Sequence, residues 1–103
     1  MAIVHGKKDT FHDLISNDLV LVDFFATWCG PCKMLGPVLE DLDSDRANVK
    51  IVKVDIDESR DLAREYGVMS VPTLLLFKNG TLVSQKVGFM PKEMLIEWIN
   101  EAR

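Results

Sequence analysis

Residues 19–33 have the sequence Leu19-Val-Leu-Val-Asp-Phe-Phe-Ala-Thr-Trp-Cys-Gly-Pro-Cys-Lys33, which carries the strongest structural signal in this chain. The first part, residues 19–26, is apolar on both faces apart from Asp23, which predicts a strand covered on both sides. The only two cysteines of the chain, Cys29 and Cys32, follow this strand with two residues between them. Apolar residues then recur at helical spacing, at Met34, Leu35, Val38, Leu39 and Leu42. Both thiols are therefore expected at the junction between a buried strand and a helix.

A Cys-x-x-Cys pair at such a junction places the sulfur of Cys29 at the N-terminus of the helix. Unpaired backbone N–H groups and the positive end of the helix dipole stabilise a thiolate there. A thiolate attacks disulfides, and a second thiol one turn away, that of Cys32, resolves the mixed disulfide. Pro31 fits the first helical turn, where its missing N–H costs nothing, and it stiffens the loop between the thiols. The spacing indicates a dithiol–disulfide redox centre with Cys29 as nucleophile and Cys32 as resolving thiol.

Half of a zinc site and a purely structural disulfide are the alternative roles for this pair. Zinc needs four ligands, and the remaining candidates, His5 and His12, lie on other predicted elements, so no metal is expected. A disulfide between such close residues closes too small a loop to stabilise the fold much. The redox role is therefore favoured over both alternatives.

Length and composition limit the class of protein. The chain has 103 residues, 48% hydrophobic and 27% charged, which fits one soluble domain over residues 1–103. Its net charge is −4 and it has no basic stripe, which argues against nucleic acid or an anionic membrane as a partner. Two cysteines are too few for a secreted disulfide scaffold, and residues 1–8 lack the apolar core of a signal peptide. We expect a cytoplasmic protein without a membrane span.

The remaining periodicity predicts strands at residues 2–5, 49–56, 73–78 and 81–87. Helices are expected to begin at Thr10 and Ser59 as N-caps, and a last helix is expected to have Pro91 in its first turn. Pro37 should kink the helix after Cys29. The apolar stripe of the last helix consists of Met94, Leu95, Trp98 and Ile99. The order β-α-β-α-β-α-β-β-α predicts an α/β fold, with a central mixed sheet of about five strands flanked by four helices.

Asp23 is the single polar residue in the apolar strand. If it is buried, desolvation raises the pKa of its carboxyl, which then takes and returns a proton near neutral pH. The alternative is an aspartate that strand twist exposes to solvent. Lys53, on a neighbouring predicted strand, is a candidate partner for Asp23 or an ordinary outward lysine. Lys33 either adds positive charge near the sulfurs or is a solvated helix residue.

The chain resembles the thioredoxin family from end to end, and five motifs carry the resemblance. These motifs are Val22-Asp-Phe-Phe-Ala26, Trp28-Cys-Gly-Pro-Cys-Lys33, Val71-Pro-Thr73, Phe77-Lys-Asn-Gly80 and Val87-Gly88. The resemblance implies the thioredoxin fold and general reduction of protein disulfides through a redox-active disulfide, with no bound cofactor. It also implies recharging by thioredoxin reductase, which carries FAD and uses NADPH. We expect a monomer that acts on protein disulfide substrates.

The same resemblance assigns roles to individual residues. Asp23 would deprotonate Cys32, with Lys53 beside it. A cis peptide bond at Pro72 would face the disulfide, and the Val71 backbone would bind an extended substrate by strand addition. The expected substrate groove consists of Trp28, Gly30, Pro31, Ile56, Ser70, Val71, Pro72, Gly88 and Phe89. Pro31 and Lys33 are expected to tune the redox centre.

The chain departs from the commonest family pattern at Phe25, where many relatives have Trp, and at Ser70, where many have Gly. Neither change removes a reacting group. Two other functions stay open at this point: a disulfide oxidase or isomerase domain, and a binding or processivity subunit without redox turnover. Pro31 argues against the first, and replacing both cysteines with serine would distinguish the second.

Overall fold

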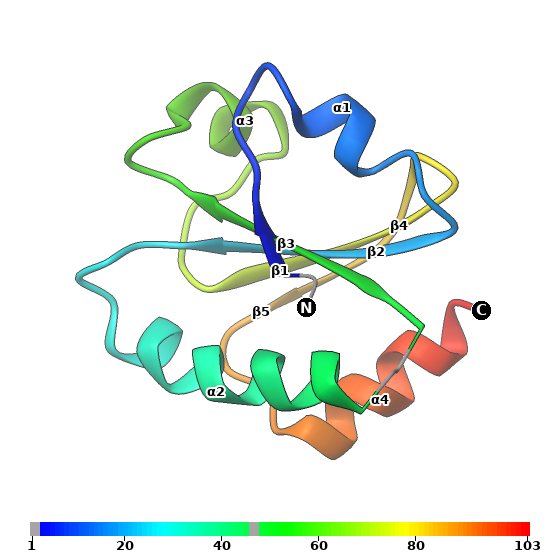
Figure 1. Ribbon diagram of the computed structural model, residues 1–103. Helices are drawn as coiled ribbons and strands as arrows, with labels where there is room; N and C mark the ends of the chain where they lie inside the picture. Colours follow the sequence, from blue (N-terminus) through cyan, green and yellow to red (C-terminus); the bar gives the residue numbers. More distant parts are fainter. Residues whose placement is uncertain (1–2, 46–47) are drawn as a thin grey trace.

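The computed structural model describes residues 3–45 and 48–103 and contains the predicted alternation of strands and helices (Figure 1). Ala2, which the sequence placed in the first strand, lies outside the described residues. The elements are β1 (Ile3–His5), α1 (Phe11–Leu14), β2 (Leu19–Phe25), α2 (Gly30–Ser44), β3 (Lys50–Asp55), α3 (Arg60–Glu65), β4 (Thr73–Lys78), β5 (Thr81–Val87) and α4 (Lys92–Glu101).

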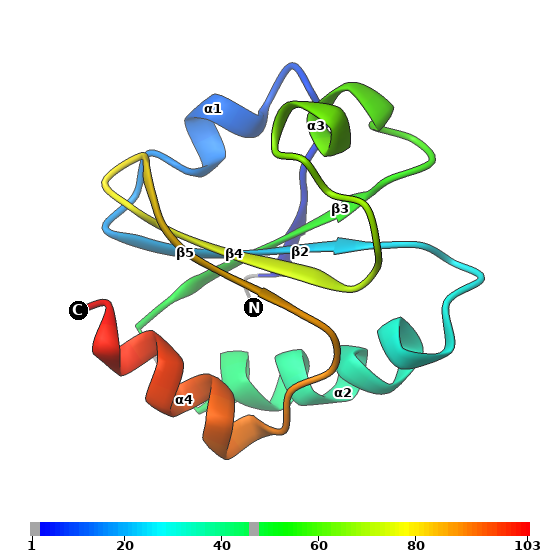
Figure 2. The ribbon, with the colours of Figure 1, turned by 180° about the vertical axis from the view of Figure 1, so that it is seen from behind.

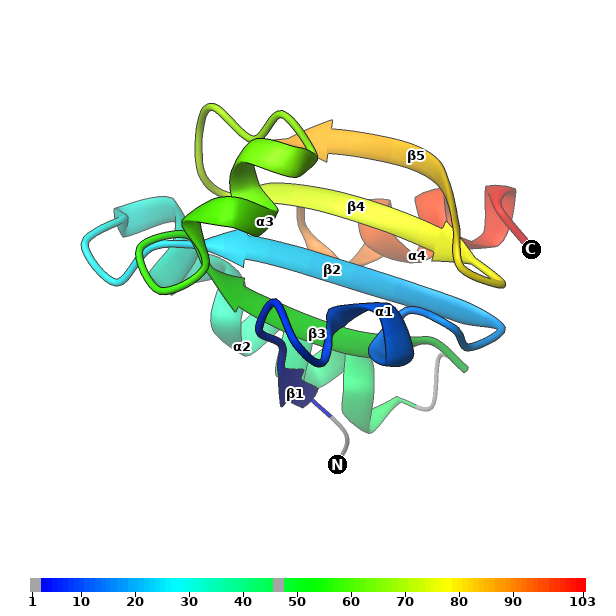
Figure 3. The same cartoon turned by 90° about the horizontal axis from the view of Figure 1, so that it is seen from above.

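One mixed sheet with the strand order β1-β3-β2-β4-β5 forms the centre of the molecule (Figure 3). β1 and β2 each pair with β3 in parallel, whereas β4 pairs antiparallel with both β2 and β5. β2, the strand predicted to be covered on both sides, lies in the middle of the sheet, and β1 lies at one edge. Asn79 and Gly80 join β4 to β5 with φ values of 51° and 84°, the left-handed conformation that their dipeptide predicts.

The helices cover both faces of the sheet, with α1 and α3 on one side and α2 and α4 on the other (Figures 1 and 2). Side chains of β2 alternate between these two layers, as expected for a strand. Leu19 and Leu21 pack in a cluster with residues of α2 and α4, whereas Val20, Val22 and Phe24 pack in a cluster with residues of α1 and α3. Within the described residues, no helix is both long and apolar enough to cross a membrane.

Thr10 and Ser59 are the N-cap residues of α1 and α3, as the sequence predicts, but neither makes a side-chain hydrogen bond to its helix. Thr10 Oγ1 instead bonds to the backbone of Lys7. Met34 and Met94 are exposed, because each lies at the edge of its helical stripe where solvent is within reach.

Pro91 and Pro37 both belong to helices that the sequence predicts. Pro91 is the N-cap residue of α4, one position before the first turn that the sequence suggested. Pro37 lies inside α2, which continues through it to Ser44, and the predicted kink stays a prediction.

Replacement of Phe11 by alanine tests the packing of the short helix α1. The Phe11 side chain is completely buried, and its ring contacts those of Phe24, Tyr66 and Phe77. We expect Phe11→Ala to lower the free energy of unfolding by about 3–5 kcal/mol, because it leaves a cavity among these rings. Urea denaturation measures the change. The exposed neighbour variant Asp9→Ala is the control, and equal stability of the two variants would contradict this packing.

Candidate active site

Cys29 and Cys32 lie where the sheet gives way to α2. β2 ends at Phe25, Cys29 is the N-cap residue of α2, and Pro31 occupies the first turn. The Cys32 backbone N–H donates to Cys29 Sγ at 3.1 Å. The two sulfurs are within bonding distance, with a Cα–Cα separation of 5.2 Å. This is the helix-start position that the spacing predicts, and a donor there stabilises negative charge on Cys29 Sγ.

Both cysteines are largely buried, each with 5% of its surface exposed. In the disulfide form, neither cysteine is therefore more exposed than the other. The physical reason is the cover around the pair: Phe25, Ile56 and Val71 pack against the small cluster that contains the two cysteines. Access to Cys29 Sγ must come past these side chains or by their movement.

The loop before β4 faces the disulfide, as the resemblance implied. The Val71–Pro72 peptide bond is cis. The Val71 carbonyl oxygen lies 3.6 Å from Cys29 Sγ, and the Gly88 N–H donates to the Pro72 carbonyl at 2.8 Å. Val71, Pro72 and Gly88 are therefore brought together beside Cys29, and Ile56 joins them through its contact with the cysteine cluster.

Trp28, directly before Cys29 in the chain, is exposed. Two-thirds of its surface is accessible (67%), and its Nε1–H donates to Asp57 Oδ2 at 3.0 Å. The sequence did not indicate Asp57, because a contact across 29 positions leaves no periodic signal. The other expected groove residues Gly30, Pro31, Ser70 and Phe89 are exposed, and their contact with substrate stays a prediction.

Asp23 is completely buried, so the alternative of an exposed aspartate is excluded. Its two neighbours across the sheet are Lys53 on β3 and Leu74 on β4. Neither carboxylate oxygen has a hydrogen-bond partner among the described residues. Burial raises the pKa of Asp23 to about 6, and the positive charge of Lys53 lowers it in part. A carboxyl with such a pKa exchanges protons near neutral pH.

Lys53 lies opposite Asp23 on the neighbouring strand, but no hydrogen bond joins the two side chains. The Lys53 Nζ atom lies over the ring of Phe25, 4.7 Å from its centroid. A cation over an aromatic face is attracted by the ring quadrupole, and this contact draws the ammonium toward Phe25. The sequence missed Phe25 as a site residue, although its position two residues after Asp23 puts both on one face of β2. Lys33 is exposed, and its influence on the sulfurs stays a prediction.

The described residues contain no group of three or more His, Cys, Asp or Glu side chains that could hold a metal ion. The site brings three kinds of group together. These are the sulfurs of Cys29 and Cys32 at the start of α2, the buried carboxyl of Asp23 on β2, and the Val71 backbone beside Cys29 Sγ. Such a set can exchange a dithiol for a disulfide and move a proton.

Comparison with known proteins gave matches over almost the whole chain. The family model described as Thioredoxin matches residues 2–101. Thioredoxin from Bacillus subtilis is 52% identical over 102 residues, which cover 98% of each chain. Thioredoxin from Staphylococcus saprophyticus is 50% identical over 102 residues with the same coverage. Among solved structures, a mutant thioredoxin from Halobacterium salinarum has a TM-score of 0.91 and 40% identity, covering 97% of this chain and 89% of that one.

The raised pKa of Asp23 predicts how stability depends on pH. The unfolded chain releases this proton near 3.8 and the folded protein near 6, so between these values the folded state binds more protons. The stability that protonated Asp23 contributes is fully present below pH 3.8 and is lost as pH rises through about 6.

The variant Asp23→Asn stays neutral at every pH. Relative to the unaltered protein, we expect its free energy of unfolding to rise by about 3 kcal/mol between acidic and neutral pH. Urea denaturation across this pH range measures the difference in free energy of unfolding. The oxidised proteins are used, because disulfide-bonded cysteines do not titrate. Asp9→Asn, at an exposed position, is the control. A pH-independent difference between Asp23→Asn and the unaltered protein would show that the pKa of Asp23 is the same in the folded and unfolded states.

Proposed function

Because the chain belongs to the thioredoxin family, we propose a residue-by-residue account of how it reduces protein disulfides. The protein is a thiol–disulfide oxidoreductase whose redox group is the Cys29–Cys32 pair, and proteins of this family carry no bound cofactor. The observation that carries the account is the position of Cys29 at the N-cap of α2, where the Cys32 N–H donates to its sulfur. No observation favours a binding subunit without redox turnover, or an oxidase or isomerase.

In the first step the Cys29 thiolate attacks one sulfur of a substrate disulfide. A bond forms between Cys29 Sγ and that sulfur, the substrate S–S bond breaks, and the released sulfur leaves as a thiolate that takes a proton from water. The helix start supports this step, because backbone N–H groups and the helix dipole favour the thiolate form of Cys29.

In the second step Cys32 resolves the mixed disulfide. Its thiol gives a proton to Asp23, and the resulting thiolate attacks Cys29 Sγ. The Cys29–Cys32 disulfide forms, the bond to the substrate breaks, and the second substrate sulfur leaves. Burial of Asp23 supports this role, since a carboxyl with a pKa of about 6 is ready to accept a proton near neutral pH. The positive charge of Lys53 acts on this step by lowering the pKa of Asp23 in part.

An extended segment of the substrate is proposed to lie along residues 70–72 and the Gly88 loop. The Val71 backbone would bond to it in the manner of an added strand, with the side chains of Trp28, Ile56 and Phe89 as apolar contacts. Exposure of the aromatic rings of Trp28 and Phe89, at 67% and 38%, supports a surface that another chain covers. Gly30, Pro31 and Ser70 complete this surface, and Pro31 and Lys33 tune the redox centre.

Disulfide substrates and a reductase partner follow from the family. The finer proposal is that thioredoxin reductase, with its FAD and NADPH, restores the dithiol. We further propose that residues 1–103 act as one domain, as a monomer, in the cytoplasm. Two hydrophobic clusters that share one sheet support the single domain, and the need for a reduced dithiol supports a reducing compartment.

Serine variants of the two cysteines test the assignment of nucleophile and resolving thiol. In an insulin-disulfide reduction assay with thioredoxin reductase and NADPH, Cys29→Ser and Cys32→Ser should each abolish turnover. Cys32→Ser alone should accumulate covalent adducts with substrate on Cys29, because nothing resolves them. Mass spectrometry locates the adducts. Ser44→Ala, exposed at the far end of α2, is the control and should turn over normally.

The opposite pattern of adducts would reverse the assignment. If Cys29→Ser traps substrate on Cys32 while Cys32→Ser forms no adduct, then Cys32 is the nucleophile. If a chain with both cysteines replaced still performs its cellular role, the redox reaction is not its function.

A further inference from the structure

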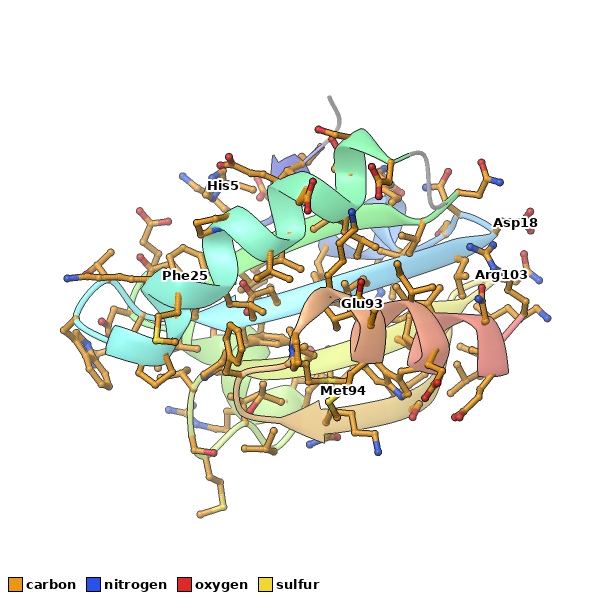
Figure 4. The ribbon with its side chains drawn as sticks, turned by 90° about the horizontal axis from the view of Figure 1, so that it is seen from below. His5, Asp18, Phe25, Glu93, Met94 and Arg103 are labelled. Atoms are coloured by element: carbon orange, nitrogen blue, oxygen red, sulfur yellow. A yellow bond between two sulfur atoms is a disulfide. The ribbon has the colours of Figure 1, made fainter. Side chains whose placement is uncertain are left out.

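Phe25 links the disulfide to the lysine beside Asp23. Its side chain packs against the cluster that contains Cys29 and Cys32. The Lys53 ammonium lies over its ring at 4.7 Å, and the His5 ring meets it edge-on with centroids 6.2 Å apart. His5 and Phe25 lie at the same end of the sheet, beside the first turns of α2 (Figure 4). One aromatic side chain therefore packs against the cluster of the redox pair and also holds the cation of the site over its ring.

Lys53 has two possible partners on one face of β2. In the parallel register of β2 and β3 it lies directly opposite Asp23, and Phe25 follows two residues later on β2. Residues two apart on a strand share a face, so Asp23 and Phe25 both lie on the side that carries Lys53. The flexible four-carbon stem of lysine can bring its ammonium to either. When the ammonium of Lys53 contacts Phe25, it lies farther from Asp23, and the reverse also holds.

The structure shows the ammonium over the ring, while both oxygens of Asp23 lack a hydrogen-bond partner. We propose that Phe25 is a positioning residue: its ring holds the Lys53 ammonium off Asp23, so that the buried carboxyl stays free to take the proton of Cys32. This inference rests on the proton-accepting role proposed for Asp23 and specifies how that role is maintained. The partial lowering of the Asp23 pKa by Lys53 fits a cation that is near but not bonded.

Other ionisable groups face this region from the surrounding elements, and none of them replaces Lys53. Of the two residues paired with Asp23 across the sheet, only Lys53 is charged. α4 presents apolar side chains to this face, and its Glu93 and Glu97 are exposed. The remaining groups are His5 on β1, the cysteines at the start of α2, and Glu40 and Asp43, which line a surface cavity of about 480 Å³ together with Lys53.

The test is a carbon-13 NMR titration of the Asp23 carboxyl in the oxidised protein. Phe25→Leu keeps apolar bulk but removes the aromatic face, so that Lys53 is free to approach Asp23. We expect the titration midpoint to fall by about half a pH unit, or about a threefold rise in the ratio of ionised to protonated Asp23. Phe25→Tyr keeps the aromatic face and should keep the unaltered midpoint.

Lys53→Met provides the matched background, because it removes the cation and keeps an unbranched side chain. In this background Phe25→Leu should no longer lower the midpoint. An unchanged or raised midpoint in Phe25→Leu overturns the inference. So does an equal fall in Phe25→Tyr, or a fall that persists in the Lys53→Met background.

The proposed function is judged by a separate readout on the same variants. Well above the midpoint, where Asp23 is ionised in both proteins, the rate of mixed-disulfide resolution should fall in Phe25→Leu by up to about threefold, because a carboxylate with a lower pKa is a weaker base. A lowered midpoint without any change in this rate supports the placement of Lys53 and contradicts Asp23 as proton acceptor. An unchanged midpoint overturns the placement alone, whatever the rate.

Discussion

Strand β2 is buried on both faces and paired along both edges, and the place of each group in the active site depends on this burial. The two core clusters lie on either side of it, and β3 and β4 flank it. A polar residue in such a strand has no route to water, so the carboxyl of Asp23 is buried with its neighbours. The strand ends at Phe25, and the chain then turns so that Cys29 begins α2.

Burial of the ionised carboxylate of Asp23 costs free energy, and the same free energy raises its affinity for a proton. An ionised carboxylate without hydrogen bonds is unfavourable in the core, and for that reason the protonated form persists toward neutral pH. A merely stable fold would place leucine there, which would pack without this penalty. The site thus combines a helix start that favours a thiolate on Cys29 with a buried carboxyl that we propose as the proton acceptor for Cys32. Burial dominates the balance between the two forms of Asp23, and the nearby Lys53 charge shifts it partly toward the ionised form.

The sequence predicted those features that leave a local signal. An apolar run broken only by Asp23 identified β2 as a strand covered on both faces, and the cysteine spacing identified the redox pair. Features that depend on competition between distant groups were not predictable. Thr10 and Ser59 stand at the N-cap positions that the sequence predicts, but they make no side-chain cap hydrogen bond. The Trp28 partner Asp57 lies on another loop, and the Lys53 ammonium lies over an aromatic ring rather than against the carboxylate opposite it.

The most direct test of the central claim is the rate at which Cys32 resolves a mixed disulfide, measured against pH in the unaltered protein and in Asp23→Asn. If Asp23 accepts the proton, the rate in the unaltered protein rises as Asp23 ionises. In Asp23→Asn it should then be slower at neutral pH by on the order of a hundredfold, rising only where the thiol itself loses its proton. Equal rates with the same pH profile would contradict the claim that this buried carboxyl takes part in the reaction.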